Sequence, residues 1–125
     1  MTELNFLIHH ASLIVSDTER AKAFYCGVLG LKQTERPDLG FPGLWLQLNE
    51  QQLHLLELPN PDPTTGRPEH GGRDRHVALT VGQLDAVKDL LVQHGITFTL
   101  SKSGRRALFF RDPDGNAIEV IERVS

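Results

Sequence analysis

The feature that most constrains the fold is an internal repeat. The segment His-Ala-Ser-Leu-Ile-Val at 10–15 returns as His-Val-Ala-Leu-Thr-Val at 76–81, 66 residues further along the chain. Each copy has the pattern of a β-strand and is followed by a helical pattern that ends at glycine. The sequence therefore predicts a single domain over 1–125 that is built from two similar modules, at about 6–58 and about 75–123.

A helix is expected after the repeated strand of each module. In the first module Ser16 and Glu19 have the spacing of a capping box, and Gly30 follows the last apolar position as a helix stop. In the second module Gly95 has the equivalent place. Apolar residues at helical spacing give each helix one buried face. They are Ala21, Phe24, Tyr25, Val28 and Leu29 in the first helix, and Leu84, Val87, Leu90 and Leu91 in the second.

Three shorter strand patterns follow each helix. They lie near 31–36, 43–48 and 52–58 in module one, and near 96–101, 105–111 and 117–123 in module two. Asp-Pro-Asp-Gly-Asn at 112–116 is a hairpin turn signal. Each module is therefore predicted as βαβββ. The fold class is α+β, with two curved mixed sheets that form a metal-binding cup and helices on the outer face. The proline- and glycine-rich stretch at about 59–74 is interpreted as a linker.

Side chains alternate across a strand, so the parity of a position predicts the face to which it points. The apolar parity is expected to pack on the helices, which sends His10, His54, His76 and Glu119 to the open face of the sheets. His10 and His54 are 44 residues apart, and His76 and Glu119 are 43 apart. Each module thus offers one such group on its first strand and one on its last. A two-fold relation between the modules would gather all four.

Three imidazoles and a carboxylate suit zinc, nickel, iron, manganese or cobalt better than calcium or magnesium, which prefer oxygen ligands. We therefore predict one divalent metal ion bound by His10, His54, His76 and Glu119. Such an ion can hold two neighbouring oxygens of a substrate and stabilise negative charge that develops beside them. Glu119 is the candidate for moving the proton.

Composition narrows the partners. The net charge is −3, and the 13 basic and 16 acidic residues are scattered, which gives no electrostatic footprint for nucleic acid or an anionic membrane. There is no apolar run of membrane-spanning length and no secretory leader pattern, so a cytoplasmic protein that acts on a small molecule is expected. Cys26 is the single cysteine and is interpreted as a packing residue.

Several other residues have two interpretations. Arg105 and Arg106 either bind a carboxylate or phosphate of a substrate or keep an exposed strand soluble. Trp45 and Phe109 line either the pocket or the core, and parity alone does not decide which. His70 lies in the linker, where a solvated side chain is expected.

The motifs resemble the vicinal oxygen chelate superfamily. The likeness rests on the strand that begins at His10, on Phe-Tyr-Cys-Gly-Val-Leu-Gly-Leu at 24–31, on His-Val-Ala-Leu at 76–79, and on Phe-Arg-Asp-Pro-Asp-Gly-Asn-Ala-Ile-Glu at 110–119. Their order and spacing cover almost the whole chain. The superfamily includes glyoxalase I, extradiol ring-cleaving dioxygenases, thiol transferases of fosfomycin resistance and metal-free bleomycin-binding proteins.

This resemblance implies a ligand set. Members bind metal through the histidine of the first strand, its counterpart in the second module and the glutamate after the turn, which correspond here to His10, His76 and Glu119. Glyoxalase I takes a fourth ligand from the last strand of the first module, where this chain has His54 in place of glutamate. Because that glutamate serves in proton transfer, its replacement weakens an assignment to glyoxalase I itself.

The leading functional prediction is a glyoxalase-like metal-dependent enzyme of lyase or isomerase type. One alternative is an iron(II)-dependent extradiol-type dioxygenase, although no counterpart of its additional acid–base histidine and tyrosine can be placed. Another is a non-catalytic binding or resistance protein. The cup forms either within one chain or between two, and because members of this kind often dimerise, a homodimer is expected.

Overall fold

Each module folds as the repeat predicts. The computed structural model describes residues 3–124. Module one contains β1 (His10–Val15), α1 (Thr18–Lys22) continued by the π-helical η1 (Ala23–Val28), β2 (Lys32–Thr34), β3 (Gly43–Leu48) and β4 (Gln51–Glu57). Module two contains β5 (His76–Val81), α2 (Leu84–Gln93), β6 (Thr99–Leu100), β7 (Ala107–Arg111) and β8 (Ala117–Glu122). The 3-10 turn η2 (Gly71–Arg73) lies in the linker. The strands β2 and β6 are shorter than predicted.

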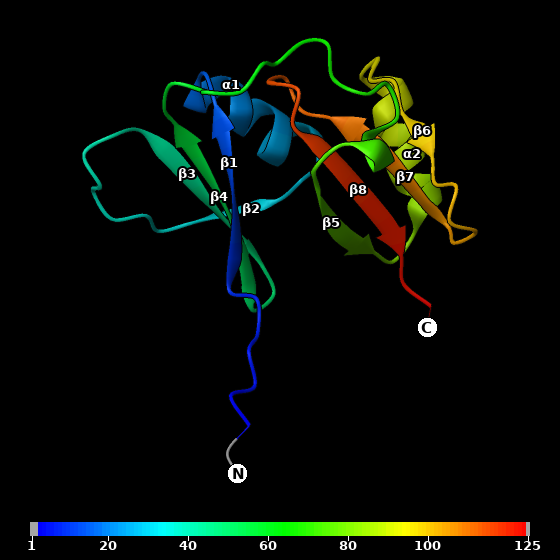
Figure 1. The fold of residues 1–125 in the computed structure, drawn as a ribbon, viewed down its shortest axis with the longest axis horizontal. Coiled ribbons are helices and arrows are strands. Elements are labelled where there is room, and N and C mark those ends of the chain that lie inside the picture. The colour runs from blue at the N-terminus through cyan, green and yellow to red at the C-terminus, as the bar shows by residue number, and fades with distance from the viewer. Residues whose placement is uncertain (1–2, 125) are drawn as a thin grey trace.

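The two sheets have the same topology. Their strand orders are β1-β4-β3-β2 and β5-β8-β7-β6, and in each the first strand runs parallel to the last. The register also matches, because Ser12 pairs with His54 in one sheet and Ala78 pairs with Glu119 in the other. The predicted α+β class with two βαβββ modules is confirmed. The two sheets do not close on each other into a cup within the chain (Figure 1).

The first helix begins one residue later than the capping box predicts. Asp17 is the N-cap, and its Oδ1 accepts hydrogen bonds from the backbone N–H groups of Glu19 and Arg20 at 2.9 and 3.1 Å. Ser16 instead accepts a bond from the Arg20 guanidinium at 2.6 Å. An aspartate suits this position because its charge also interacts favourably with the helix dipole. The helix ends before Gly30, whose φ of 75° is the left-handed conformation that glycine adopts readily.

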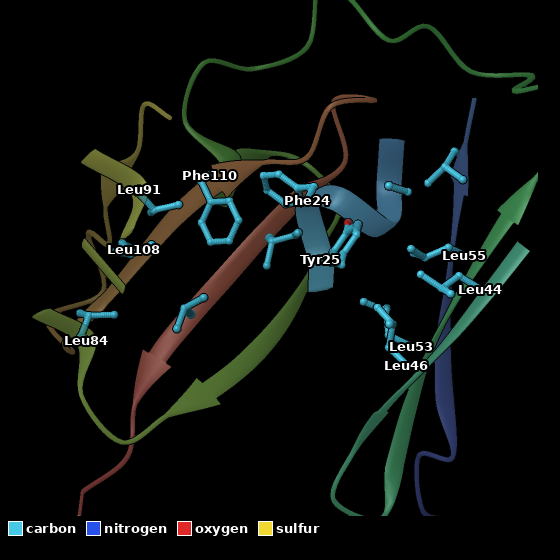
Figure 2. Close-up of a cluster of buried hydrophobic side chains, with 14 residues drawn as sticks. Phe24, Tyr25, Leu44, Leu46, Leu53, Leu55, Leu84, Leu91, Leu108 and Phe110 are labelled. Carbon is cyan, nitrogen blue, oxygen red and sulfur yellow. The ribbon is translucent and has the colours of Figure 1, made fainter. Parts of the chain in front are cut away.

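One hydrophobic core is shared by the two modules (Figure 2). Phe24 and Tyr25, on the helix of module one, lie between the leucines of sheet β1-β4-β3-β2 and the apolar side chains of module two. The predicted parity is confirmed. The buried strand residues that belong to this core are Val15, Leu44, Leu46, Leu53 and Leu55 in module one, and Leu108, Phe110, Ile118 and Val120 in module two. Since a single helix contacts both groups, the core fixes how the modules sit relative to each other.

The turn at 112–116 joins the modules through polar contacts. The Tyr25 hydroxyl is fully buried and donates to Asp112 Oδ2 at 2.6 Å, and Asn116 Nδ2 donates to the Ile14 carbonyl at 2.9 Å. Burial raises the pKa of the Tyr25 hydroxyl, and the neighbouring Asp112 carboxylate raises it further. The sequence predicted this segment only as a hairpin turn. In the structure it also forms hydrogen bonds with β1 and with the first helix.

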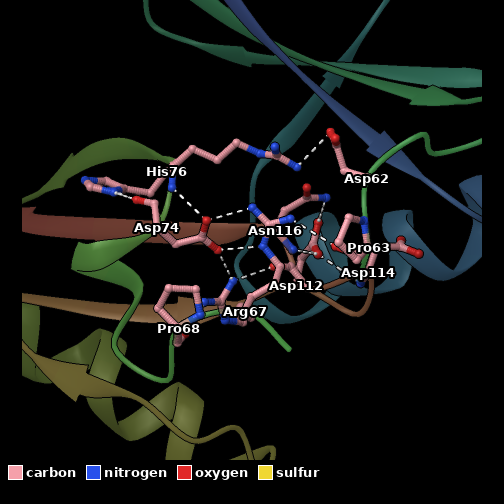
Figure 3. A network of polar contacts seen from close by, with 12 residues as sticks. Asp62, Pro63, Arg67, Pro68, Asp74, His76, Asp112, Asp114 and Asn116 are labelled. Carbon is pink, nitrogen blue, oxygen red and sulfur yellow. Dashed lines mark hydrogen bonds and ion pairs between the residues drawn. The ribbon is translucent and has the colours of Figure 1, made fainter. Parts of the chain in front are cut away.

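The linker is anchored to module two by one carboxylate (Figure 3). Asp74 accepts two hydrogen bonds from Arg67, at 2.7 and 2.6 Å, and one from Arg111 of β7 at 2.8 Å. The hydrogen bonds from Arg67 and Arg111 hold the pKa of Asp74 well below its ordinary value.

Among residues 3–124 no helix combines the length and apolar character that crossing a membrane requires.

Candidate metal site in two halves

The four predicted site residues lie on the sheet faces that point away from the helices, as two separate pairs. In module one the imidazole rings of His10 and His54 stack, with centroids 4.0 Å apart and planes at 18°. In module two His76 Nε2 is 3.3 Å from Glu119 Oε1. Within the described residues 3–124 there is no group of three or more His, Cys, Asp or Glu placed to hold one metal ion. Each module thus supplies half of the predicted ligand set.

The imidazole of His54 is held in one orientation by its neighbours. It is 8% exposed and lies between His10 and the indole of Trp45, whose centroid is 4.1 Å away at an interplanar angle of 4°. Its Nε2 is 2.8 Å from Gln52 Oε1, while the amide nitrogen of Gln52 donates to Gln47 Oε1 at 2.8 Å. Because Gln52 Oε1 can only accept, His54 carries its proton on Nε2 and its lone pair on Nδ1. Burial lowers the pKa of His54, and the nearby His10 lowers it further, so the ring is neutral at pH 7.

His76 and Glu119 form the second half. His76 Nδ1 lies 2.8 Å from the carbonyl oxygen of Asp74, so Nδ1 is the protonated nitrogen and Nε2 faces Glu119. The Glu119 side chain is almost fully buried, and its second oxygen is 3.3 Å from Arg105 Nη2. The Phe109 ring meets His76 edge-on, with centroids 5.0 Å apart.

The register settles the two aromatic residues that parity had left open. Trp45 is the cross-strand partner of His54, and Phe109 is the partner of Glu119, so both flank the site rather than the core. The signal for Trp45 was present in the sequence, because Leu44 and Leu46 on either side of it have the core parity.

The linker folds over part of the module-two half-site. The His70 ring packs edge-on against Phe109 at 4.9 Å between centroids, and its Nδ1 lies 2.6 Å from Thr99 Oγ1. The backbone of the buried Gly71 also lies close to Phe109, because a Cβ atom added at Gly71 would be only 3.1 Å from the Cβ of Phe109. The expectation that His70 is solvated is therefore wrong. It is half-buried because the turn η2 lies against β7 and β8.

The donor atoms of the two pairs suit a divalent metal ion. His76 Nε2 and a carboxylate oxygen of Glu119 face each other at 3.3 Å, a pair that either a proton on Nε2 or a bound cation would satisfy. An imidazole nitrogen binds a metal ion through a lone pair that lies in the plane of the ring. The stacked rings of His10 and His54 can therefore both bind one ion only if one ring rotates. His10 Nδ1 lies 2.9 Å from His9 Nδ1, which leaves its Nε2 for a ligand.

Two mixed four-stranded sheets of identical topology, each with a pair of possible metal ligands on its open face, define a two-module fold of the vicinal oxygen chelate type. The chain belongs to the Glyoxalase/Bleomycin resistance protein/Dioxygenase superfamily, whose family model matches residues 7–120.

Similar proteins agree with this assignment. The uncharacterised protein YwkD of Bacillus subtilis is 39% identical over 124 residues, which cover 93% of this chain and 96% of YwkD. Lactoylglutathione lyase of Salmonella typhimurium is 30% identical over 125 residues, with 90% of each chain covered. Among solved structures, TnmS3, an antibiotic-binding protein from Streptomyces, has a TM-score of 0.76 at 24% identity. That match covers 98% of this chain and 100% of TnmS3, and it shows likeness of fold.

Proposed function

We propose that the protein is a glyoxalase-like, metal-dependent enzyme of lyase or isomerase type that acts on a small substrate with neighbouring oxygen atoms. In this proposal His10 and His54 of one chain, with His76 and Glu119 of a second copy, bind one divalent ion of zinc, nickel, iron, manganese or cobalt. The observation that carries the proposal is the strand register. His54 pairs with Ser12, two residues after His10, and Glu119 pairs with Ala78, two residues after His76, so the two ligand pairs occupy the same positions in the two sheets. A two-fold axis between copies would set one pair against the other.

Two features support a site between chains. The angle between the modules is fixed by the shared core and by the buried hydrogen bond from Tyr25 to Asp112, so closing the sheets within one chain would break both. The segment before β1 also leaves apolar side chains in solvent, which association of two copies would cover. They are Leu4, Phe6, Leu7 and Ile8, with exposures of 75%, 88%, 89% and 72%.

The side chains divide the chemical work. A bound divalent ion supplies Lewis-acid stabilisation of negative charge on the substrate oxygens. Glu119 would hold the ion and move a proton to or from the adjacent carbon. The carbonyl of Asp74 orients His76, and Gln52 orients His54, as hydrogen-bond partners of metal ligands commonly do. Trp45 and Phe109 would bound the substrate and exclude water.

A mixing experiment tests the arrangement between chains. The variants H10Q/H54Q and H76Q/E119Q each lose half of every site, so each alone should bind no metal. A purified heterodimer of the two would combine one intact site with one that lacks all four ligands, giving about one metal ion per dimer against about two for the wild type. A site within one chain predicts no recovery in the heterodimer. Less than about a tenth of an equivalent in the reconstituted wild type would end the metalloenzyme proposal.

The reaction class is tested by turnover. The protein is reconstituted with each of the five metals and assayed with thiol adducts of 2-oxoaldehydes, and with catechols while oxygen uptake is followed. Metal-dependent conversion of the adducts without oxygen uptake is expected. Oxygen uptake restricted to the iron form with catechols would replace this proposal with a ring-cleaving dioxygenase.

A further inference from the structure

One cationic side chain points into the module-two half-site with most of its donors free. Arg105, in the loop between β6 and β7, contacts Glu119 Oε2 through Nη2 at 3.3 Å and makes no other hydrogen bond or ion pair to residues in the described part of the chain. Its side chain is 58% exposed. A guanidinium has five N–H donors, so four of them have no protein acceptor among residues 3–124.

The adjacent arginine is committed elsewhere. Arg106 Nε donates to Glu122 Oε1 at 2.9 Å, and its Nη2 donates to Asp85 Oδ1 at 3.0 Å. The hydrogen bonds that Arg106 donates to these two carboxylates raise its pKa. The two neighbouring arginines therefore have different partners, because Arg106 binds Asp85 of α2 and Glu122 of β8, whereas Arg105 contacts Glu119 at the site. In the sequence Arg105 and Arg106 had the same two interpretations, and the structure shows that they have different partners.

The contact between Arg105 and Glu119 leaves room for a second anion. Charge-assisted N–H···O bonds are typically about 2.7–2.9 Å long, and an arginine that satisfies a carboxylate commonly does so with two parallel bonds. Arg105 makes a single longer contact, to a carboxylate whose other oxygen faces His76. Its planar fork remains available for a carboxylate or phosphate, the groups that it binds best.

We propose that Arg105 is a specificity-determining residue that binds an anionic carboxylate or phosphate group of the substrate, beside the two oxygens held by the metal ion. This inference rests on the proposed metal site. The substrate class narrows accordingly to small molecules that carry neighbouring oxygens at one end and an oxyanion at the other.

Binding of matched hydroxamates to the cobalt(II)-loaded protein tests the inference. Butyrohydroxamate and succinic acid monohydroxamate share the same metal-binding end and chain length, and only the second carries a terminal carboxylate. A phosphonate of the same length, 3-phosphonopropionohydroxamate, distinguishes the two oxyanions. The visible spectrum of cobalt reports binding at the metal without any need for turnover.

The wild type should bind at least one of the charged probes about tenfold more tightly than butyrohydroxamate. R105Q should lose this preference, so that the charged probes bind no more tightly than butyrohydroxamate. R106Q is the matched control and should keep the preference. R105K retains the charge without the fork and should keep only part of it.

Three results would overturn the inference. The first is a wild type that binds butyrohydroxamate and shows no preference for either charged probe. The second is a preference that survives in R105Q. The third is loss of bound cobalt in R105Q, which would make Arg105 only a positioning residue for Glu119. In all three the wild type still binds cobalt and butyrohydroxamate, so the proposed function stands. A wild type that binds no cobalt fails the proposed function, and the inference falls with it.

Discussion

Replacing Asp74 by asparagine tests how strongly the linker is anchored beside the site. The substitution keeps the size of the side chain and removes its charge, which leaves Arg67 (Figure 3) without its counter-ion. Arg111 loses the same partner. All three side chains are largely buried, with exposures of 8% for Asp74, 15% for Arg67 and 25% for Arg111. Water therefore cannot fully replace the lost contacts.

The magnitude follows from these contacts. A hydrogen bond to a charged group contributes about 1.5–3 kcal/mol, and removing one partner of a buried ion pair costs about 3–5 kcal/mol. Since the two arginines are partly exposed, we expect D74N to lower the free energy of unfolding by about 3 kcal/mol at pH 7. The matched control is D62N, which breaks the pair of Asp62 with Arg75. Those side chains are 47% and 61% exposed, so about 0.5 kcal/mol or less is expected.

The same contacts set a pH dependence. The folded-state pKa of Asp74 is depressed, so its contribution is complete above the unfolded-state pKa of about 3.9 and is lost as the pH falls below that value. The wild type should therefore lose about 1 kcal/mol per pH unit relative to D74N below pH 4. Asp112 has the opposite sign, because burial raises its pKa, but it is present in both proteins and cancels in the difference.

Urea unfolding of wild type, D74N and D62N from pH 3 to pH 8 measures these differences, with protein concentration held fixed because association adds to stability. A D74N protein within 1 kcal/mol of the wild type at pH 7 would refute the estimate of the anchor's strength. A gap that does not narrow between pH 4 and pH 3 would show that the charge of Asp74 is not its source.

Three further predictions concern the core, the backbone and the metal. Y25F should lower the free energy of unfolding by about 2 kcal/mol in urea, because buried Asp112 loses a 2.6 Å bond, and a loss below 0.5 kcal/mol would contradict this. G43A should cost about 2 kcal/mol or more, since its Cβ would lie 2.5 Å from the Leu55 carbonyl oxygen. G27A, with nothing within 4 Å, should change stability by about 0.5 kcal/mol or less, and equal effects would refute this reasoning. Zinc at a hundredfold excess over its dissociation constant should stabilise the protein by about 2.7 kcal/mol in thermal unfolding, reversed by a chelator, and no shift would count against the metal site.

Local patterns determined much of the fold. The repeat predicted two βαβββ modules because a strand followed by an amphipathic helix is specified by residues close in the chain. Parity placed His10 and His54 on one open face, and His76 and Glu119 on another, since alternation is a property of each strand alone. The prediction from local sequence was wrong at the N-terminus of the first helix, where two neighbouring residues could each serve as the N-cap. Asp17 and not Ser16 caps the first helix, and its negative charge also interacts favourably with the helix dipole.

Only the tertiary structure decided how these faces meet. The separation of the two ligand pairs depends on the angle between the modules. That angle is held open by the core that Phe24 helps to form between the modules, and by the hydrogen bond between Tyr25 and Asp112, which are 87 residues apart. The different partners of Arg105 and Arg106 likewise come from strands and a helix distant in sequence. Contacts of this range are set by how whole elements pack, a property that no single segment of the sequence carries.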